Sequence, residues 1–68
     1  MIKLTRLNKT QFTLNCELIE TIESTPDSVI TLTNGKKYVV LEEVDDIIEK
    51  IISFKKQLFS IYNTYTKE

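Results

Sequence analysis

The chain has 68 residues, a formal net charge of −1 and 41% apolar residues, which indicates one small folded domain rather than a disordered segment. It has no histidine and a single cysteine, so the sequence excludes an intrachain disulfide and lacks the Ser–His and Cys–His pairs of common nucleophilic enzymes. We therefore predict a protein that is not an enzyme and holds no cofactor or metal ion.

The hydrophobic core of so short a chain is marginal. A domain of this length buries only about 60% of the surface that its unfolded chain exposes. Small scaffolds usually gain stability from disulfides, a metal or a partner subunit. Because the composition argues against the first two, we expect self-association or an unusually well-packed core.

The sequence shows neither a secretory leader nor an apolar run near the roughly 18 residues of a membrane span. We therefore expect a cytoplasmic protein that does not insert into a membrane, and the lone thiol fits a reducing compartment.

The first forty residues have the composition of strands. Residues 2–7 alternate apolar and polar side chains, residues 8–10 are typical of a turn, and residues 11–14 resemble a second strand. This segment predicts a β-hairpin. Residues 15–24 combine helical spacing with β-branched side chains, and we interpret them as a single turn that leads into a short strand.

A second hairpin has the stronger local signal. Residues 25–28, Thr-Pro-Asp-Ser, predict a type I turn. Two strands, at 29–33 and 36–41, then flank Asn34-Gly35, the dipeptide favoured in two-residue type I′ turns. Such a turn would place Thr31 opposite Tyr38.

From residue 43 to about residue 62 the apolar period becomes helical. Acidic residues crowd the start of this segment and lysines follow, an order that complements the helix dipole. We predict an α+β fold, with a small antiparallel β-sheet of four to five short strands within 1–41 followed by one long C-terminal helix. Residues 1–62 form the single predicted domain, and 63–68 a frayed tail.

The predicted helix is longer than the sheet that it covers. About 20 helical residues span about 30 Å, whereas strands of five or six residues span only about 17–20 Å. The far third of the helix would therefore extend beyond the sheet with apolar side chains exposed, and such patches usually mark a partner. We predict an oligomer interface along the heptad-spaced residues Val44, Ile47, Ile51, Phe54, Leu58 and Ile61.

Basic residues on the strands leave an alternative open. A contact face for nucleic acid would comprise Lys3, Arg6, Lys9, Lys36 and Lys37. Lysine on edge strands also serves to block unwanted strand pairing, and no aromatic residues interleave with these lysines to stack bases. The overall charge argues against a general nucleic-acid binder.

Two further features have ordinary structural readings. The carboxylates at positions 42, 43, 45, 46 and 49 lie where a helix N-terminus favours acids, and no glycine-rich calcium loop accompanies them. Cys16 is expected to be a small buried side chain rather than a reactive thiol.

Several blocks of the sequence resemble the FlbD family of small flagellar and swarming motility proteins, to which SwrD-like proteins are related. The blocks are MIKLTRLN at 1–8, LN at 14–15, LIE at 18–20, TPDSVITL at 25–32 and GKKYVV at 35–40. The resemblance extends to about residue 55. The family commonly has a glycine in the first turn, where this chain has Lys9, and often a serine at the helix start, where this chain has Leu41-Glu42-Glu43.

The resemblance implies a cytoplasmic protein that supports flagellar function, with no catalytic residues to transfer. We therefore expect a self-associating interaction protein whose partner is a component of the flagellar apparatus, in the cytoplasm at or near the flagellar base. The alternative is a small nucleic-acid-binding regulator of motility genes.

Overall fold

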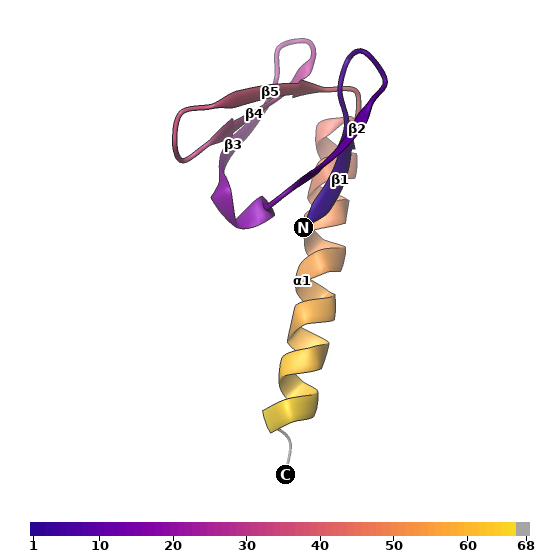
Figure 1. The fold of residues 1–68 in the computed structure, drawn as a ribbon, viewed down its shortest axis with the longest axis vertical. Coiled ribbons are helices and arrows are strands. Elements are labelled where there is room, and N and C mark those ends of the chain that lie inside the picture. Colours follow the sequence, from indigo (N-terminus) through magenta and orange to yellow (C-terminus); the bar gives the residue numbers. More distant parts are fainter. Residues whose placement is uncertain (67–68) are drawn as a thin grey trace.

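The structure, a computed structural model, describes the backbone of residues 1–66 and the side chains of residues 1–60. Five short strands and a 3-10 turn precede one long helix (Figure 1). In chain order the elements are β1 (Ile2–Thr5), β2 (Gln11–Leu14), a 3-10 turn (Cys16–Leu18), β3 (Ile19–Ser24), β4 (Ser28–Leu32), β5 (Lys37–Val40) and α1 (Val44–Thr66). The predicted α+β class, with antiparallel strands and a C-terminal helix, is confirmed.

The strands form two sheets rather than the single sheet expected. β1 pairs with β2, and β3, β4 and β5 pair in that order, all antiparallel. The 3-10 turn separates the sheets, because Asn15 accepts a hydrogen bond from the amide of Glu17 and turns the chain between β2 and β3. The prediction of a turn followed by a short strand over residues 15–24 is confirmed.

The β1–β2 loop contains an unusual backbone conformation. Lys9 has φ +72°, a left-handed conformation that side chains other than glycine rarely adopt. The loop is held by the amide of Lys9, which donates to the carbonyl of Arg6 (2.9 Å), and by the side chain of Asn8, which accepts from the amide of Thr10 (3.1 Å). The position where the family commonly has glycine is therefore one that requires a positive φ.

The β4–β5 hairpin has a different turn from the one predicted. Of the residues described, only Lys9 and Gly35 have positive φ, whereas a type I′ turn requires it at both central residues. Residues 33–35 form a three-residue loop: the amide of Leu32 donates to the carbonyl of Lys36 (2.8 Å), and the carbonyl of Leu32 accepts from the amide of Gly35 (2.9 Å). The predicted register was wrong by one residue: Tyr38 lies opposite Ile30, so both side chains share the core-facing side.

The turn at residues 25–28 lies where it was predicted, but it is not a type I turn. The Thr25–Pro26 peptide bond is cis, and the amide of Thr25 donates to the carbonyl of Asp27 (3.0 Å).

The core lies between the two sheets and the first turns of α1. Its fully enclosed side chains are Leu4, Ile30, Val40 and Ile47, and the other buried members are Ile2, Leu14, Cys16 and Leu32. Cys16 is buried, as predicted. A bridge between Arg6 and Val40 joins the end of β1 to the end of β5, so the two sheets enclose one core rather than two.

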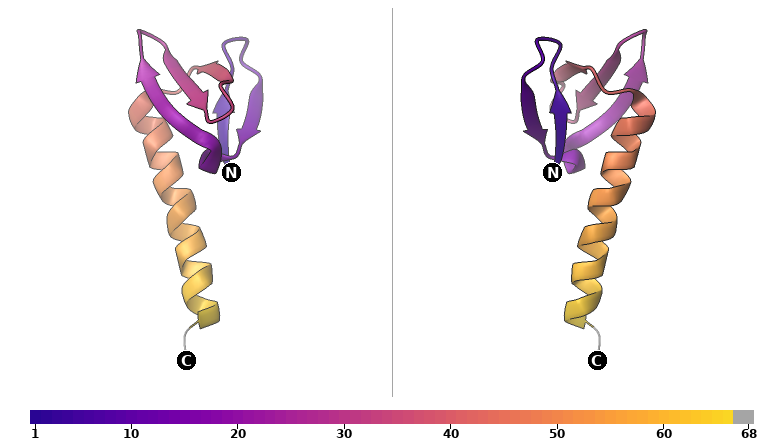
Figure 2. Two further views of the ribbon diagram at one scale, coloured as in Figure 1. Left: turned by 90° about the vertical axis from the view of Figure 1, so that its left-hand side faces the viewer. Right: turned by 90° about the vertical axis from the view of Figure 1, so that its right-hand side faces the viewer.

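The helix extends well beyond the sheets. Figure 2 shows from both sides that the β elements lie against the first half of α1 and that its second half projects away from them. The molecule measures 47 × 23 × 18 Å as a result. The helix backbone continues to Thr66, beyond the end predicted near residue 62, and residues 67–68 of the predicted tail lie outside the described residues.

Candidate functional site

A polar clamp fixes where α1 leaves the β layer. The carboxylate of Glu42 accepts two hydrogen bonds from Thr5, one from the amide (2.9 Å) and one from the hydroxyl (2.7 Å). The amide of Leu41 donates to the carbonyl of Thr5 (2.9 Å). The segment that joins β5 to α1 is thus tied to the end of β1, and this sets the direction of the helix.

The electrostatics of Glu42 follow from the same contacts. Partial burial raises the pKa of its carboxyl, but the two hydrogen bonds from Thr5, with the charge of Lys50, outweigh it. The net pKa lies below the ordinary value, so the carboxylate is the form that the fold stabilises.

The first half of α1 uses its heptad-spaced side chains for the protein's own core. Ile47 has no exposed surface, and Ile51 and Phe54 pack half-buried against the core. Ile47 was predicted to lie in an oligomer interface, whereas its side chain is enclosed by the protein's own core. Val44 is likewise half-buried. Heptad spacing alone did not distinguish a helix that covers its own sheet from one that meets another chain.

A second line of apolar side chains remains exposed along the same helix. Ile48 and Ile52 are each 42% exposed, and Phe59 is 63% exposed. At 100° per residue these three side chains project within about 40° of one another, on a face roughly 100° or more from Ile47. We call Ile48, Ile52 and Phe59 the α1 stripe.

Beyond the sheets the two apolar lines are both uncovered. Leu58 continues the line of Ile47 and Ile51, and it is 45% exposed because the β layer ends before it. The predicted exposure of apolar side chains on the projecting part of the helix is confirmed at Leu58 and Phe59. Ile61, the last residue of the predicted interface, has its side chain outside the described residues.

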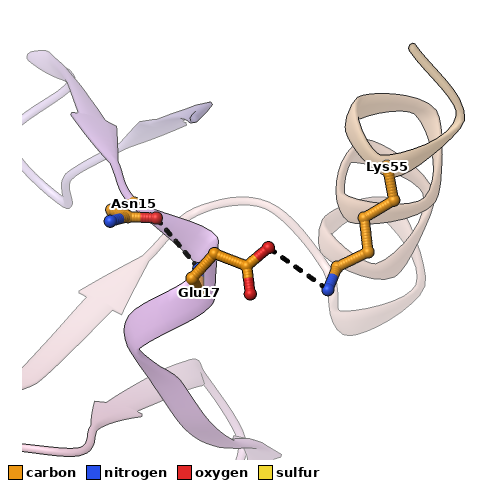
Figure 3. A network of polar contacts seen from close by, with 3 residues as sticks. All are labelled: Asn15, Glu17 and Lys55. Carbon is orange, nitrogen blue, oxygen red and sulfur yellow. Dashed lines mark hydrogen bonds and ion pairs between the residues drawn. The ribbon is translucent and has the colours of Figure 1, made fainter. Parts of the chain in front are cut away.

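One ion pair links the projecting helix to the β layer. The ammonium of Lys55 lies 3.5 Å from a carboxylate oxygen of Glu17, and Asn15 holds the backbone of Glu17 in place (Figure 3). Both charged side chains are more than half exposed, so the pair contributes little to stability. It does occupy Lys55, which lies at the edge of the α1 stripe.

The predicted basic face is divided in the structure. Arg6 and Lys9 lie in and beside the β1–β2 loop, and Lys36 and Lys37 lie at the β4–β5 turn, at the opposite end of the β layer (Figure 1). Lys3 is exposed on β1. One protomer therefore does not bring these five residues together.

An aromatic contact occupies one of these cations. The guanidinium of Arg6 stacks 4.3 Å from the ring centre of Phe12, which in turn packs 5.3 Å from the ring of Tyr38. This cation–π contact covers the ring that a base would need for stacking.

Comparison with known proteins identifies the family. The family model for FlbD, described as flagellar and swarming motility proteins, matches residues 1–59. The chain belongs to the FlbD family. No curated protein and no solved structure matches it.

The FlbD match ends at Phe59, four residues beyond the resemblance noted in the sequence, and so it includes the whole α1 stripe. Association with flagellar and swarming motility follows from membership of this family.

Metal-binding clusters and membrane-spanning helices are further features that could indicate a function for this FlbD chain. Within the part that the structure describes, no three acidic, cysteine or histidine side chains gather where they could hold a metal ion. None of the helices in that part is long and apolar enough to cross a membrane. The exposed apolar surface of α1 is therefore the strongest candidate site.

The predicted interface followed the heptad-spaced residues and did not include the α1 stripe, which lies beside them. The signal that identifies the stripe is the length of the helix relative to the strands: once the sheets occupy the seam, the flanking residues are the ones left exposed.

Proposed function

We propose that this FlbD-family protein is a non-enzymatic interaction protein that supports flagellar motility in the cytoplasm by self-association through the exposed apolar surface of α1. The observation that supports it is the exposure of Phe59 and Leu58 on a helix that projects beyond its own core. Large apolar side chains gathered on one exposed face usually mark a binding surface.

Self-association would also compensate for the small hydrophobic core by burying more apolar surface. Eight buried apolar side chains make up the core within the described residues, which is a modest number for a domain with no disulfide. A second copy on α1 would extend the buried apolar surface without any new element.

The assembled protein then presents its β layer to a component of the flagellar apparatus. The outer side of β5 carries Val39, which is 37% exposed, and Leu41 follows it at 49%. Val39 points to the side of β5 opposite Tyr38 and Val40, which pack in the core, so it would remain available to a second protein.

The first test is solution mass by light scattering across a dilution series. We expect wild type to form a discrete oligomer and Phe59→Lys to be monomeric, with the β layer and the first half of α1 still folded. Gln57→Lys is the matched control, since it adds the same charge on the opposite face of the helix. A wild type that is monomeric at every concentration would contradict self-association.

The motility part is tested in the host bacterium. Deletion of the gene should impair swarming, and a wild-type copy should restore it while a Phe59→Lys copy produced at equal level should not. Unchanged swimming and swarming after deletion would overturn the role in motility, whatever the solution mass shows.

A further inference from the structure

The α1 stripe is flanked by charges that change sign along the helix. At 100° per residue, Asp45, Glu49 and Lys56 lie on one flank of the stripe, with the two acids toward the start of α1 and the lysine toward its end. The other flank carries Lys55, which pairs with Glu17, and beyond it Ile51 and Leu58. The surface therefore has an acidic end and a basic end on one side, and one paired lysine with apolar residues on the other.

The charges on the first flank are not satisfied within one copy. Glu49 and Lys56 are seven residues apart, which is about 10 Å along a helix and too far for an ion pair. Neither has an ion-pair partner among the described residues. The ion pair that α1 does form joins Lys55 to Glu17 (Figure 3). An acid and a base are thus left available at a fixed spacing along one line.

We propose that a second copy of this chain lies antiparallel along the α1 stripe, with a twofold axis that crosses the stripe at the height of Ser53. In this arrangement Ile48 faces Phe59 of the second copy, and Glu49 faces Lys56 of the second copy. The midpoints of these two pairs fall within about one residue of each other, so a single axis satisfies both. This register rests on the self-association proposed above and specifies its geometry.

The apolar flank agrees with the same axis. The midpoint between Ile51 and Leu58 falls between Phe54 and Lys55, within about two residues of the other two midpoints, so each Leu58 would lie close to Ile51 of the other copy. Leu58, which its own sheets leave exposed, would then be covered. In antiparallel helix pairs, flanking positions of this kind meet their counterparts across the axis and set the orientation of the partners.

A parallel pair is disfavoured by charge and by shape. It would place the charged flank of each helix against the apolar flank of the other, so Glu49 and Lys56 would face Ile51 and Leu58 and find no opposite charge. It would also crowd both β layers at one end of the helices. In the antiparallel pair the β layers lie toward opposite ends, because each covers only the first half of its own helix (Figure 2).

Charge exchange tests the register. Glu49→Lys and Lys56→Glu each turn two attractive contacts into two repulsive ones. Each should therefore raise the dissociation constant of the dimer about tenfold. The double variant Glu49→Lys/Lys56→Glu restores opposite charges across the axis and should return to within about threefold of wild type. Sedimentation equilibrium at low salt measures all four constants, and circular dichroism checks that each variant is folded.

Each outcome has a separate meaning. Single variants without effect, or a double variant weaker than both singles, would overturn the antiparallel register while wild-type self-association and its loss in Phe59→Lys would still stand. A monomeric wild type would overturn self-association itself, and the register with it.

Discussion

Lys9 occupies a backbone conformation that costs a side chain with a Cβ about 1–2 kcal/mol. Lys9→Gly should therefore stabilise the protein by about 0.5–1 kcal/mol, since glycine removes this cost but adds freedom to the unfolded chain. At about 4–8 °C per kcal/mol for a domain of this size, the melting temperature should rise by several degrees.

Lys9→Ala is the control for this prediction, because it deletes the lysine side chain and keeps the Cβ. It should leave the melting temperature close to that of wild type. An equal rise in both variants would mean that the lysine charge, rather than the conformation, limits stability.

Glu42 ties the helix start to β1 through two hydrogen bonds from Thr5. Glu42→Gln leaves an amide that can accept only one of these bonds, so we expect a loss of about 1–2 kcal/mol in the free energy of unfolding at pH 7. Glu43→Gln is the matched control: its carboxylate takes no part in the clamp, and its smaller cost should reflect only the helix dipole. Urea titration measures both.

The pH dependence of the Glu42 contribution has a definite sign. Because the pKa of Glu42 is lowered by folding, its stabilisation is present above the pKa of the unfolded chain and is lost as pH falls through the lower, folded pKa. The difference between wild type and Glu42→Gln should therefore shrink in acid. A difference that stayed constant from pH 7 to pH 3 would contradict the role of the ionised carboxylate.

Helix α1 contributes both to the core and to the proposed interface, and its two apolar lines should respond differently to truncation. Ile47→Ala removes a fully buried side chain and should cost about 2–5 kcal/mol. Ile52→Ala, at a side chain of the same type in the α1 stripe, should cost about 1 kcal/mol or less in the free energy of unfolding at low concentration, yet weaken the oligomer. Equal effects of the two on stability would show that both lines belong to the core.

The sequence was informative about elements and less so about how they meet. Alternation in residues 2–14 and the helical period after residue 43 identified the strands and the helix, because both periods are local. The register of the hairpin at Asn34-Gly35 depends on contacts distant in the sequence. The same dipeptide fits a two-residue and a three-residue loop, and the packing of Ile30 with Tyr38 on the core side selects the longer one. Which face of the helix meets the core also depends on tertiary contacts. Only packing shows that Ile47 faces the core and Ile52 does not.

The molecule as a whole should be stabilised by its own concentration. An oligomer that forms only from folded chains favours the folded state by mass action. For a dimer of this size, each tenfold increase in protein concentration should raise the melting temperature by about 3–6 °C. Differential scanning calorimetry at several concentrations measures this shift. Phe59→Lys should show none, and a wild-type melting temperature independent of concentration would exclude a dimer coupled to folding.

The projection of α1 beyond the β layer also divides the helix into two parts with different lifetimes. Amide hydrogens around Ile47 lie against the core and should exchange with solvent only when the whole domain opens. Those after Lys56 have no such cover in a single copy, and an unsupported helix of about ten residues is marginal in water. Under the proposed self-association, their exchange rates should therefore be fast in dilute protein and slow once copies assemble, and the outer half of α1 would then be ordered by the partner rather than by the chain that carries it.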